Sequence, residues 1–210
     1  MATIRSGAHS FCIDRYEASL VEIEGRRTKP HSPFEPVGGK KVRAVSRRSV
    51  VPQAYISKIE AEAACVNAGK RLCTEGEWVR ACEGEEKRLY PYGESRKQNT
   101  CNDHGKAPVP LLHGDLGDSA YGSFSAMNDP ELNRVPGTVA RTGSHAKCKT
   151  PDGVYDLVGN VHEWVSDPAG TFRGGYYLDT KQNGEGCHYR TDAHDVTYHD
   201  YSTGFRCCRD

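Results

Sequence analysis

The sequence predicts an irregular, loop-rich α+β fold with two short helices and short antiparallel strands. Two segments carry matching start and stop signals for a helix, and the strand-forming segments are short and separated by glycine or proline. Long stretches show no hydrophobic period, and the 210 residues include 22 glycines and 11 prolines. A chain of this length can bury one core, so we expect residues 1–210 to form a single domain.

The first helix is expected within ISKIEAEAACVNAGKRL, residues 56–72. Ser57 and Glu60 form a capping-box pattern at its start, and Gly69 can adopt the left-handed conformation that ends a helix. Its apolar side chains stand at helical spacing, with Cys65 alongside: Ile59, Ala63 and Val66.

The second helix is expected within CTEGEWVRACEGEEK, residues 73–87. Thr74 is the capping residue, Glu77 completes the box, and Gly84 ends the helix. Its buried face is expected to hold three side chains: Trp78, Ala81 and Cys82.

Five short segments are expected to form strands: residues 11–20, 154–158, 161–167, 172–179 and 204–208. Residues 86–150 carry mostly loop signals, such as YPYGE and HGDLGDSAYGS. A loop region this long requires disulfides, metal ions or both to hold it in place.

Charge and hydropathy exclude several classes of partner. Lysine plus arginine and aspartate plus glutamate both number 28, which removes the electrostatic argument for nucleic acid. The mean hydropathy is −0.71 and no long apolar run occurs, so no membrane span is expected. The N-terminal residues lack the apolar region of a signal peptide, which indicates either a cytosolic protein or a precursor whose leader is absent from this chain.

The cysteines favour the second alternative. Nine are dispersed along the chain without a C-x-x-C pair, at positions 12, 65, 73, 82, 101, 148, 187, 207 and 208. Dispersed single cysteines in a loop-rich chain are typical of disulfides in an extracytoplasmic protein. We therefore expect a periplasmic or secreted protein of bacterial origin. We expect a monomer, in which the odd number leaves one thiol unpaired.

The segment GVYDLVGNVHEW could bind a hard cation. Asp156 and Glu163 offer carboxylates, and Gly159 and Val161 lie in the same turn-containing segment, which supplies backbone carbonyls. On residue type alone, a hairpin turn with solvated acids is the simpler interpretation. Four further residues are either ligands or turn formers: Asn102, Asp103, Asn128 and Asp129.

Five motifs occur in an order that resembles one family. KRLCTEGEWVRAC, YPYGE, GVYDLVGNVHEWVSD, RGGYY and GFRC together are similar to the formylglycine-generating enzyme, or sulfatase-modifying factor, family. The resemblance runs from about Phe11 to Cys208, and the family's N-terminal G-x-F-x-M-G stretch is missing, so we expect an N-terminally shortened domain. It implies a compact fold related to C-type lectins. Family members oxidise a sulfatase cysteine to formylglycine with O₂ and copper held by two cysteines.

The resemblance also implies metal and disulfide sites. YDLVGNVHEW matches a family calcium loop, which makes Ca²⁺ at Asp156, Gly159, Val161 and Glu163 the favoured interpretation, with a second site at the Asn102–Asp103 loop. His162, between these ligands, is expected to point the other way. Carried over from the family, the disulfide pairs are Cys65–Cys207 and Cys82–Cys187.

Other cysteines remain without a family counterpart. Cys101 and Cys148 bracket the loop region and could staple it, whereas Cys12, Cys73 and Cys208 are unassigned. Because side chains alternate along a strand, the adjacent Cys207 and Cys208 should serve different partners.

The copper-binding cysteine pair of the family has no equivalent here. It should lie within GGYYLDTKQNGEGC, where the only cysteine is the expected staple Cys187 and Asp179 stands at the first thiol position. A carboxylate is a hard ligand and does not replace a thiolate for copper(I). Oxidation of a sulfatase cysteine is therefore not expected.

Three functions remain as hypotheses. The first is a calcium-stabilised binding protein for a peptide, protein or sugar, with a ligand groove lined by Tyr177, Asp179, Arg190, Asp192 and His194. The second is a copper- or iron-dependent oxidase or hydroxylase that uses His194, His199 and Asp179, since imidazole suits both metals. The third is a structural domain of a secreted assembly. His188 is a further candidate ligand in the same histidine-rich stretch.

Overall fold

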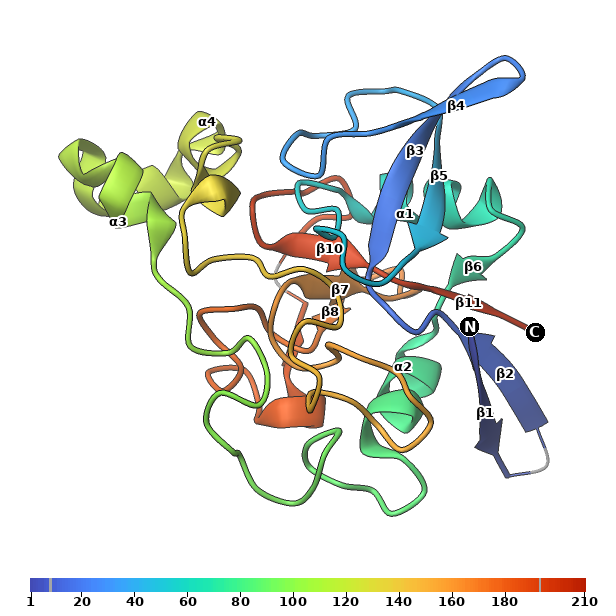
Figure 1. Ribbon diagram of the computed structural model, residues 1–210. Coiled ribbons are helices and arrows are strands. Elements are labelled where there is room, and N and C mark those ends of the chain that lie inside the picture. The colour runs from blue at the N-terminus through green and yellow to red at the C-terminus, as the bar shows by residue number, and fades with distance from the viewer. Residues whose placement is uncertain (8, 193) are drawn as a thin grey trace.

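Three small sheets form the frame of the protein (Figure 1). The computed structural model describes residues 1–7, 9–192 and 194–210. The first sheet has the order β1-β2-β11-β6: Ala2–Ser6, His9–Ile13, Cys207–Arg209 and Arg71–Leu72. The second has the order β10-β7-β8-β9: Thr203–Phe205, His162–Trp164, Phe172–Arg173 and Arg190–Thr191. The third has the order β4-β3-β5: Arg27–Pro30, Ala18–Glu24 and Val42–Ser46.

Short strands and antiparallel pairing agree with the expected fold class, with one exception. β10 pairs with β7 in parallel, with Gly204 opposite Glu163. Segment 154–158, expected as a strand, forms only an isolated bridge between Tyr155 and Lys149. Segment 11–20 is divided between β2 and β3, which belong to different sheets.

The two expected helices are present with their capping boxes. α1 spans Lys58–Val66 and α2 spans Glu75–Glu83. The Ser57 and Thr74 side chains each accept a hydrogen bond from the backbone N–H three residues later, and the glutamate at that position reaches back to the cap. These ends satisfy backbone donors that have no partner within the helix.

The buried face of α1 differs from its most apolar row. Ile59 and Val66 are 48% and 61% exposed, whereas Ala61, Ala64 and Cys65 are buried. The disulfide from Cys65 to Cys207 ties that side of the helix to β11, so small residues face the core. For α2, the expected buried residues Trp78, Ala81 and Cys82 are confirmed.

The segment 86–150, which carries mostly loop signals, contains short helices. They are α3 (Pro108–Leu112), η1 (Gly114–Gly122), α4 (Phe124–Met127) and η2 (Leu132–Arg134); η3 (Gly186–His188) follows later. Figure 1 shows α3 and α4 standing apart from the three sheets. Each of these helices has only three to nine residues, so its sequence is too short to show a helical period.

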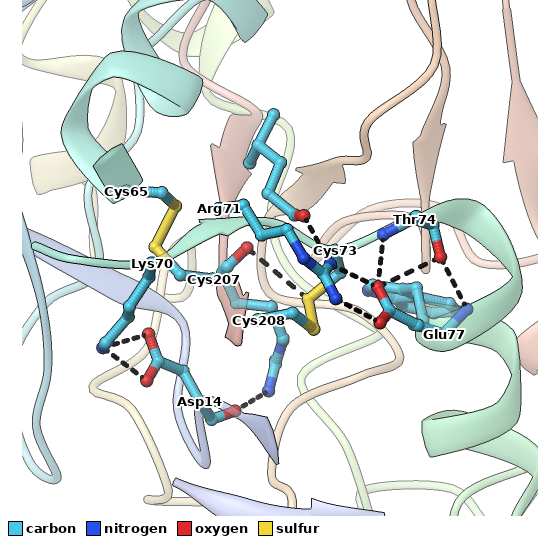
Figure 2. The surroundings of a disulfide bond; sticks show 12 residues. Asp14, Cys65, Lys70, Arg71, Cys73, Thr74, Glu77, Cys207 and Cys208 are labelled. Atoms are coloured by element: carbon cyan, nitrogen blue, oxygen red, sulfur yellow. Dashed lines mark hydrogen bonds and ion pairs between the residues drawn. A yellow bond between two sulfur atoms is a disulfide. The ribbon is translucent and has the colours of Figure 1, made fainter. Parts of the chain in front are cut away.

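Four disulfides connect these elements. They pair Cys65 with Cys207, Cys73 with Cys208, Cys82 with Cys187, and Cys101 with Cys148. Figure 2 shows the first two side by side at β11, where neighbouring cysteines reach different partners as strand alternation requires. Cys12 is the one free thiol among the described residues. Within the same residues, no helix is long and apolar enough to cross a membrane.

Candidate functional site

The two loops expected to bind calcium lie against each other. The Asn160 N–H donates to the Asn102 carbonyl (2.8 Å), and the Asn102 side-chain amide donates to Asn160 Oδ1 (2.8 Å). Gly159 has a φ of +81°, and a Cβ there would clash with the Asn102 carbonyl oxygen. Only glycine permits this approach, so this residue fixes the contact between the loops.

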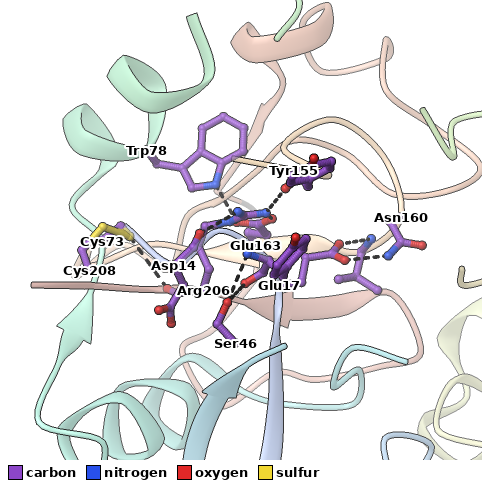
Figure 3. Close-up of polar contacts among 12 residues, drawn as sticks. Asp14, Glu17, Ser46, Cys73, Trp78, Tyr155, Asn160, Glu163, Arg206 and Cys208 are labelled. Atoms are coloured by element: carbon purple, nitrogen blue, oxygen red, sulfur yellow. Dashed lines mark hydrogen bonds and ion pairs between the residues drawn. A yellow bond between two sulfur atoms is a disulfide. The ribbon is translucent and has the colours of Figure 1, made fainter. Parts of the chain in front are cut away.

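Glu163 is held by a buried arginine (Figure 3). Arg206 donates from Nε and Nη2 to the two Glu163 oxygens at 2.6 Å each, and the Trp78 indole donates to the same carboxylate at 2.7 Å. Both side chains of the ion pair are almost completely buried. The Glu163 carboxylate, expected as a calcium ligand, is thus engaged in a two-point pair with a guanidinium.

Three buried carboxylates surround this single guanidinium. Glu17 and Asp156 lie beside Glu163. Burial, followed by repulsion from the other two acids, raises the pKa of Glu17 well above its ordinary value. Burial raises the pKa of Asp156 to about 6. The cluster therefore holds more acidic groups than positive charge.

The carboxylates of the two loops differ in how far their oxygens are engaged: both Glu163 oxygens accept from Arg206, whereas Asp156 and Asp103 each accept at one oxygen. Asp156 Oδ2 accepts from the Gly143 N–H (2.7 Å), and Oδ1 accepts no hydrogen bond from the described residues. In the neighbouring loop, Asp103 Oδ1 is buried without a partner among the same residues, while Oδ2 accepts from Arg96. No group of three or more His, Cys, Asp or Glu side chains in the described chain is arranged to hold a metal.

The five residues expected to line a groove have different environments. Tyr177 is fully buried and donates to Asn133, so it belongs to the core rather than to a groove surface. Asp179 caps a turn: Oδ1 accepts from the Lys181 and Gln182 N–H groups, and Oδ2 accepts from the Tyr189 hydroxyl (3.0 Å).

Arg190 and Asp192 form a charged network with α2. Arg190 Nε donates to Glu75 Oε1 at 2.8 Å, and its Nη1 donates to Asp192 at 2.5 Å. His194 belongs to a different cluster, stacked on Phe172 at 5.3 Å and on Tyr198 at 4.0 Å between ring centroids. The structure thus divides the predicted groove residues between the core, a turn, a charged network and an aromatic cluster.

The aromatic cluster is centred on His162, which the sequence did not single out as a binding residue. Its ring lies 4.8 Å from both Phe172 and Tyr176 and 5.5 Å from Tyr189. Burial lowers the pKa of His162 to about 3, and its buried Nδ1 has no partner among the described residues. Because side chains alternate along a strand, the His162 ring points to the other face of β7 from the Glu163 carboxylate, as expected. The neutral imidazole therefore packs as an aromatic ring.

Three partly buried rings extend this cluster: Tyr176 lies against His162, His194 stacks on Phe172, and Tyr198 stacks on His194. We call these three the aromatic face. Partial burial also lowers the pKa of His194, which favours its neutral form. Rings of this kind offer apolar area with polar tips.

Next to it lie the short helices at residues 108–127, which expose five large apolar side chains: Leu111, Leu112, Leu116, Tyr121 and Phe124. We call this set the apolar projection. Phe124 is 66% exposed and meets His199 edge-on at 5.3 Å. Tyr121 lies close enough to Tyr176 to influence its pKa. Five exposed large apolar side chains between residues 111 and 124 are compatible with an interaction surface.

The histidines and acid of the oxidase hypothesis occupy separate environments. His194 is stacked between rings, Asp179 caps its turn, and His199 Nδ1 is hydrogen-bonded to Asn128 Oδ1 at 2.7 Å. His188 pairs with Glu83 at 2.7 Å. Two residues considered as cation ligands are also engaged: Asn128 is hydrogen-bonded to His199, and Asp129 accepts from the Glu131 N–H.

The family model of the sulfatase-modifying factor enzyme 1-like domain matches residues 6–210. The chain belongs to this family. It is 30% identical over 125 residues to the formylglycine-generating enzyme of Mus musculus, covering 59% of this chain and 29% of that protein. It is 32% identical over 140 residues to the inactive C-alpha-formylglycine-generating enzyme 2 of Mus musculus, covering 62% of this chain and 39% of that protein. The matched regions thus span about a third of these relatives.

Solved structures share the fold of this sulfatase-modifying-factor domain at low sequence identity. PvdO from Pseudomonas aeruginosa superposes with a TM-score of 0.56 at 15% identity, covering 97% of this chain and 81% of that one. CarF gives a TM-score of 0.55 at 15% identity, covering 95% and 86%. Glu17, Asn160 and Arg206 are the site residues that sequence reasoning missed, although GFRC itself contains Arg206.

Proposed function

We propose that this member of the family is a binding protein for a peptide or protein segment, which it contacts through the aromatic face and the apolar projection. The observation that carries the proposal is the group of five exposed apolar side chains next to partly buried rings. Apolar side chains of a peptide can cover such a surface, whereas a sugar would leave most of it unmatched. Tyrosine, phenylalanine and histidine provide such contact area at low cost in side-chain entropy.

The segment in which the family resemblance places two copper-binding thiols offers no free thiol. Segment 174–186 contains no cysteine, and Cys187 is bonded to Cys82. Asp179 serves as a turn cap. A role in binding is also compatible with a relative named as inactive. A metal-dependent oxidase and a structural domain of a secreted assembly remain as alternatives with less support.

We further propose that calcium stabilises the fold and that the protein works in the periplasm or outside the cell. Asp156 would hold Ca²⁺ with the Gly159 and Val161 carbonyls, and its positive charge would offset the surplus of buried carboxylates. The Asn102–Asp103 loop would supply a second set of oxygens. Four disulfides support an oxidising compartment.

The binding proposal is tested with a displayed library of random peptides selected on the immobilised protein. Peptides that bind are then titrated against His194→Ala and Phe124→Ser. The matched control is Val66→Ser, which removes an equally exposed apolar side chain from α1. We expect roughly tenfold weaker binding for the first two variants and unchanged binding for the control.

Two results would overturn this proposal. One is an equal loss in the Val66→Ser control, which would indicate nonspecific adhesion. The other is selection of glycans on an array while no peptide binds.

A further inference from the structure

A second site lies along the exposed side of α2, where Arg173 of β8 also lies 5.8 Å from the centroid of the Trp78 ring. A cavity of about 450 Å³ runs along the exposed surface of this helix and reaches β8. Six of its lining residues matter here: Glu75, Gly76, Val79, Arg80, Lys87 and Arg173. The aromatic face and the apolar projection contribute no residue to this lining.

Two guanidinium groups in this lining have unsatisfied donors. Arg173 is 6% exposed, and its buried Nε has no hydrogen-bond partner among the described residues. Arg80 Nη1 is likewise buried without a partner in that part of the chain. A buried donor without an acceptor costs free energy, more so when it is charged. Both arginines line the same cavity from separate elements, and each has one donor without an acceptor among the described residues.

Acids of the lining lie near other nitrogens of the two arginines, but none accepts from the two orphan atoms. Glu75 accepts from Arg190 at 2.8 Å and lies only 3.6 Å from Arg173 Nη1. Glu83 pairs with His188 at 2.7 Å, and Glu85 lies 3.4 Å from Arg80 Nη2. Burial lowers the pKa of Arg173, and the nearby carboxylates of Glu75 and Glu83 act in the opposite direction. The local carboxylates therefore do not satisfy the two orphan donors.

We propose that this cavity is a binding site for a small oxyanion, a carboxylate or a phosphate group, held by Arg173 and Arg80. The exposed Lys87 adds positive charge at the rim. Guanidinium groups suit both anions because their N–H donors match pairs of oxygens. Gly76 leaves open space above the helix, with no heavy atom within 4 Å of the position that a Cβ would take, so its neighbours do not obstruct the oxyanion.

The test titrates the folded protein with sodium phosphate and, separately, sodium acetate, at constant ionic strength set with chloride. The readout is the Nε–Hε resonance of Arg173 by NMR. A saturable shift is expected with at least one of the two anions. Saturation by phosphate alone identifies a phosphate-type site, by acetate alone a carboxylate site, and by both a site for either group.

Variants test whether the shift of the Arg173 resonance arises from an anion bound in the cavity. Arg80→Gln and Gly76→Leu should each weaken binding by about tenfold, the first by removing a donor and the second by filling the space. Gly76→Ala adds one methyl group and should bind within about twofold of the wild type. Gly76→Leu keeps both arginines, so its result is informative even if Arg80→Gln folds poorly. The absence of saturation with both anions, or wild-type binding by Gly76→Leu, would overturn the proposal.

Discussion

Arg206 is the residue on which the buried polar cluster depends. Besides Glu163, its guanidinium donates to the Asp14 carbonyl at 3.1 Å and to the Tyr155 carbonyl at 2.8 Å. It thereby connects the end of β2, the turn before β7 and β7 itself. Removing one partner from a buried ion pair leaves the other charge uncompensated.

We therefore expect Arg206→Met to lower the free energy of unfolding by about 3–5 kcal/mol. Denaturant titration followed by tryptophan fluorescence measures this loss. The control is Glu131→Gln, which removes an exposed pair with Arg134 and should cost about 1 kcal/mol or less. Equal losses in the two variants would contradict the role of Arg206.

Individual residues of this cluster could be predicted only where a motif named them. The loop motif pointed to Asp156 and Glu163, and both lie in the buried cluster. Their partners Glu17 and Arg206 are distant in sequence, and no local pattern indicates that a strand end from near the N-terminus and one from near the C-terminus meet there. Whether Glu163 serves as a metal ligand or as an ion-pair partner depends on the presence of Arg206 beside it.

At the scale of elements, β3 carries a salt-bridge network centred on Glu22. Its carboxylate accepts from His31 Nδ1 and Lys40 Nζ at 2.8 Å each, and Lys29 lies at 3.1 Å. The hydrogen bond from His31, followed by the one from Lys40, lowers the pKa of Glu22 to about 2. The network ties β3 to β4 and to the loop before β5.

This network should make the protein sensitive to acid. The folded pKa lies below the ordinary value of 4.5, so the stabilisation is complete above pH 4.5 and is lost as the pH falls towards 2. The stability advantage of the wild type over Glu22→Gln should shrink across that interval, as measured by urea unfolding at several pH values. Glu24→Gln, at an exposed neighbouring position, should show a much smaller change. A constant difference between wild type and Glu22→Gln would refute the assignment.

The disulfides fasten elements that are distant along the chain. Cys82–Cys187 joins α2 to η3 across a sequence separation of 105 residues. Its removal in Cys82→Ser/Cys187→Ser should cost about 4–5 kcal/mol in the chain-entropy model. Thermal unfolding measures the loss, with Cys12→Ser as the control that breaks no disulfide.

Non-reducing mass spectrometry with thiol labelling provides a separate check. It should detect four disulfides and a single labelled residue, Cys12. A labelled Cys187, or a Cys12→Ser variant as destabilised as the double variant, would rule out this pattern.

Elements with local signals were the predictable part of the fold. The caps of α1 and α2 involve residues only three positions apart, so the sequence contains the whole interaction. The parallel pairing of β10 with β7 depends on residues far apart in the sequence, and so does the choice of which face of α1 is buried. Residues 154–158 have strand-forming side chains, but a positive φ at Asp156 prevents a continuous strand.

At the scale of the whole molecule, calcium would act on stability through the two joined loops. Addition of excess Ca²⁺ to chelator-treated protein should raise the melting temperature, because a ligand at about 100 times its Kd stabilises by about 2.7 kcal/mol. Differential scanning calorimetry measures the shift.

The calcium-dependent shift should be lost in Asp156→Gly, which removes the carboxylate and tolerates the φ of +60° at this position. It should persist in Asp195→Ala, a control at an exposed acid. The proposed site is excluded if the wild type shows no shift or if Asp156→Gly retains it.

Residues 203–209 contribute to two sheets, two disulfides and the buried ion pair. The ribosome makes this segment after all the other strands and helices, so folding cannot be completed progressively during synthesis. The two sheets and two disulfides that contain residues 203–209 cannot form until this segment has been made. Cys65 and Cys73 can each then react with either Cys207 or Cys208. The native pairs Cys65–Cys207 and Cys73–Cys208 therefore compete with the pairs Cys65–Cys208 and Cys73–Cys207. Oxidative folding of this protein should therefore depend more strongly on disulfide exchange than the folding of a protein whose four disulfides form independently.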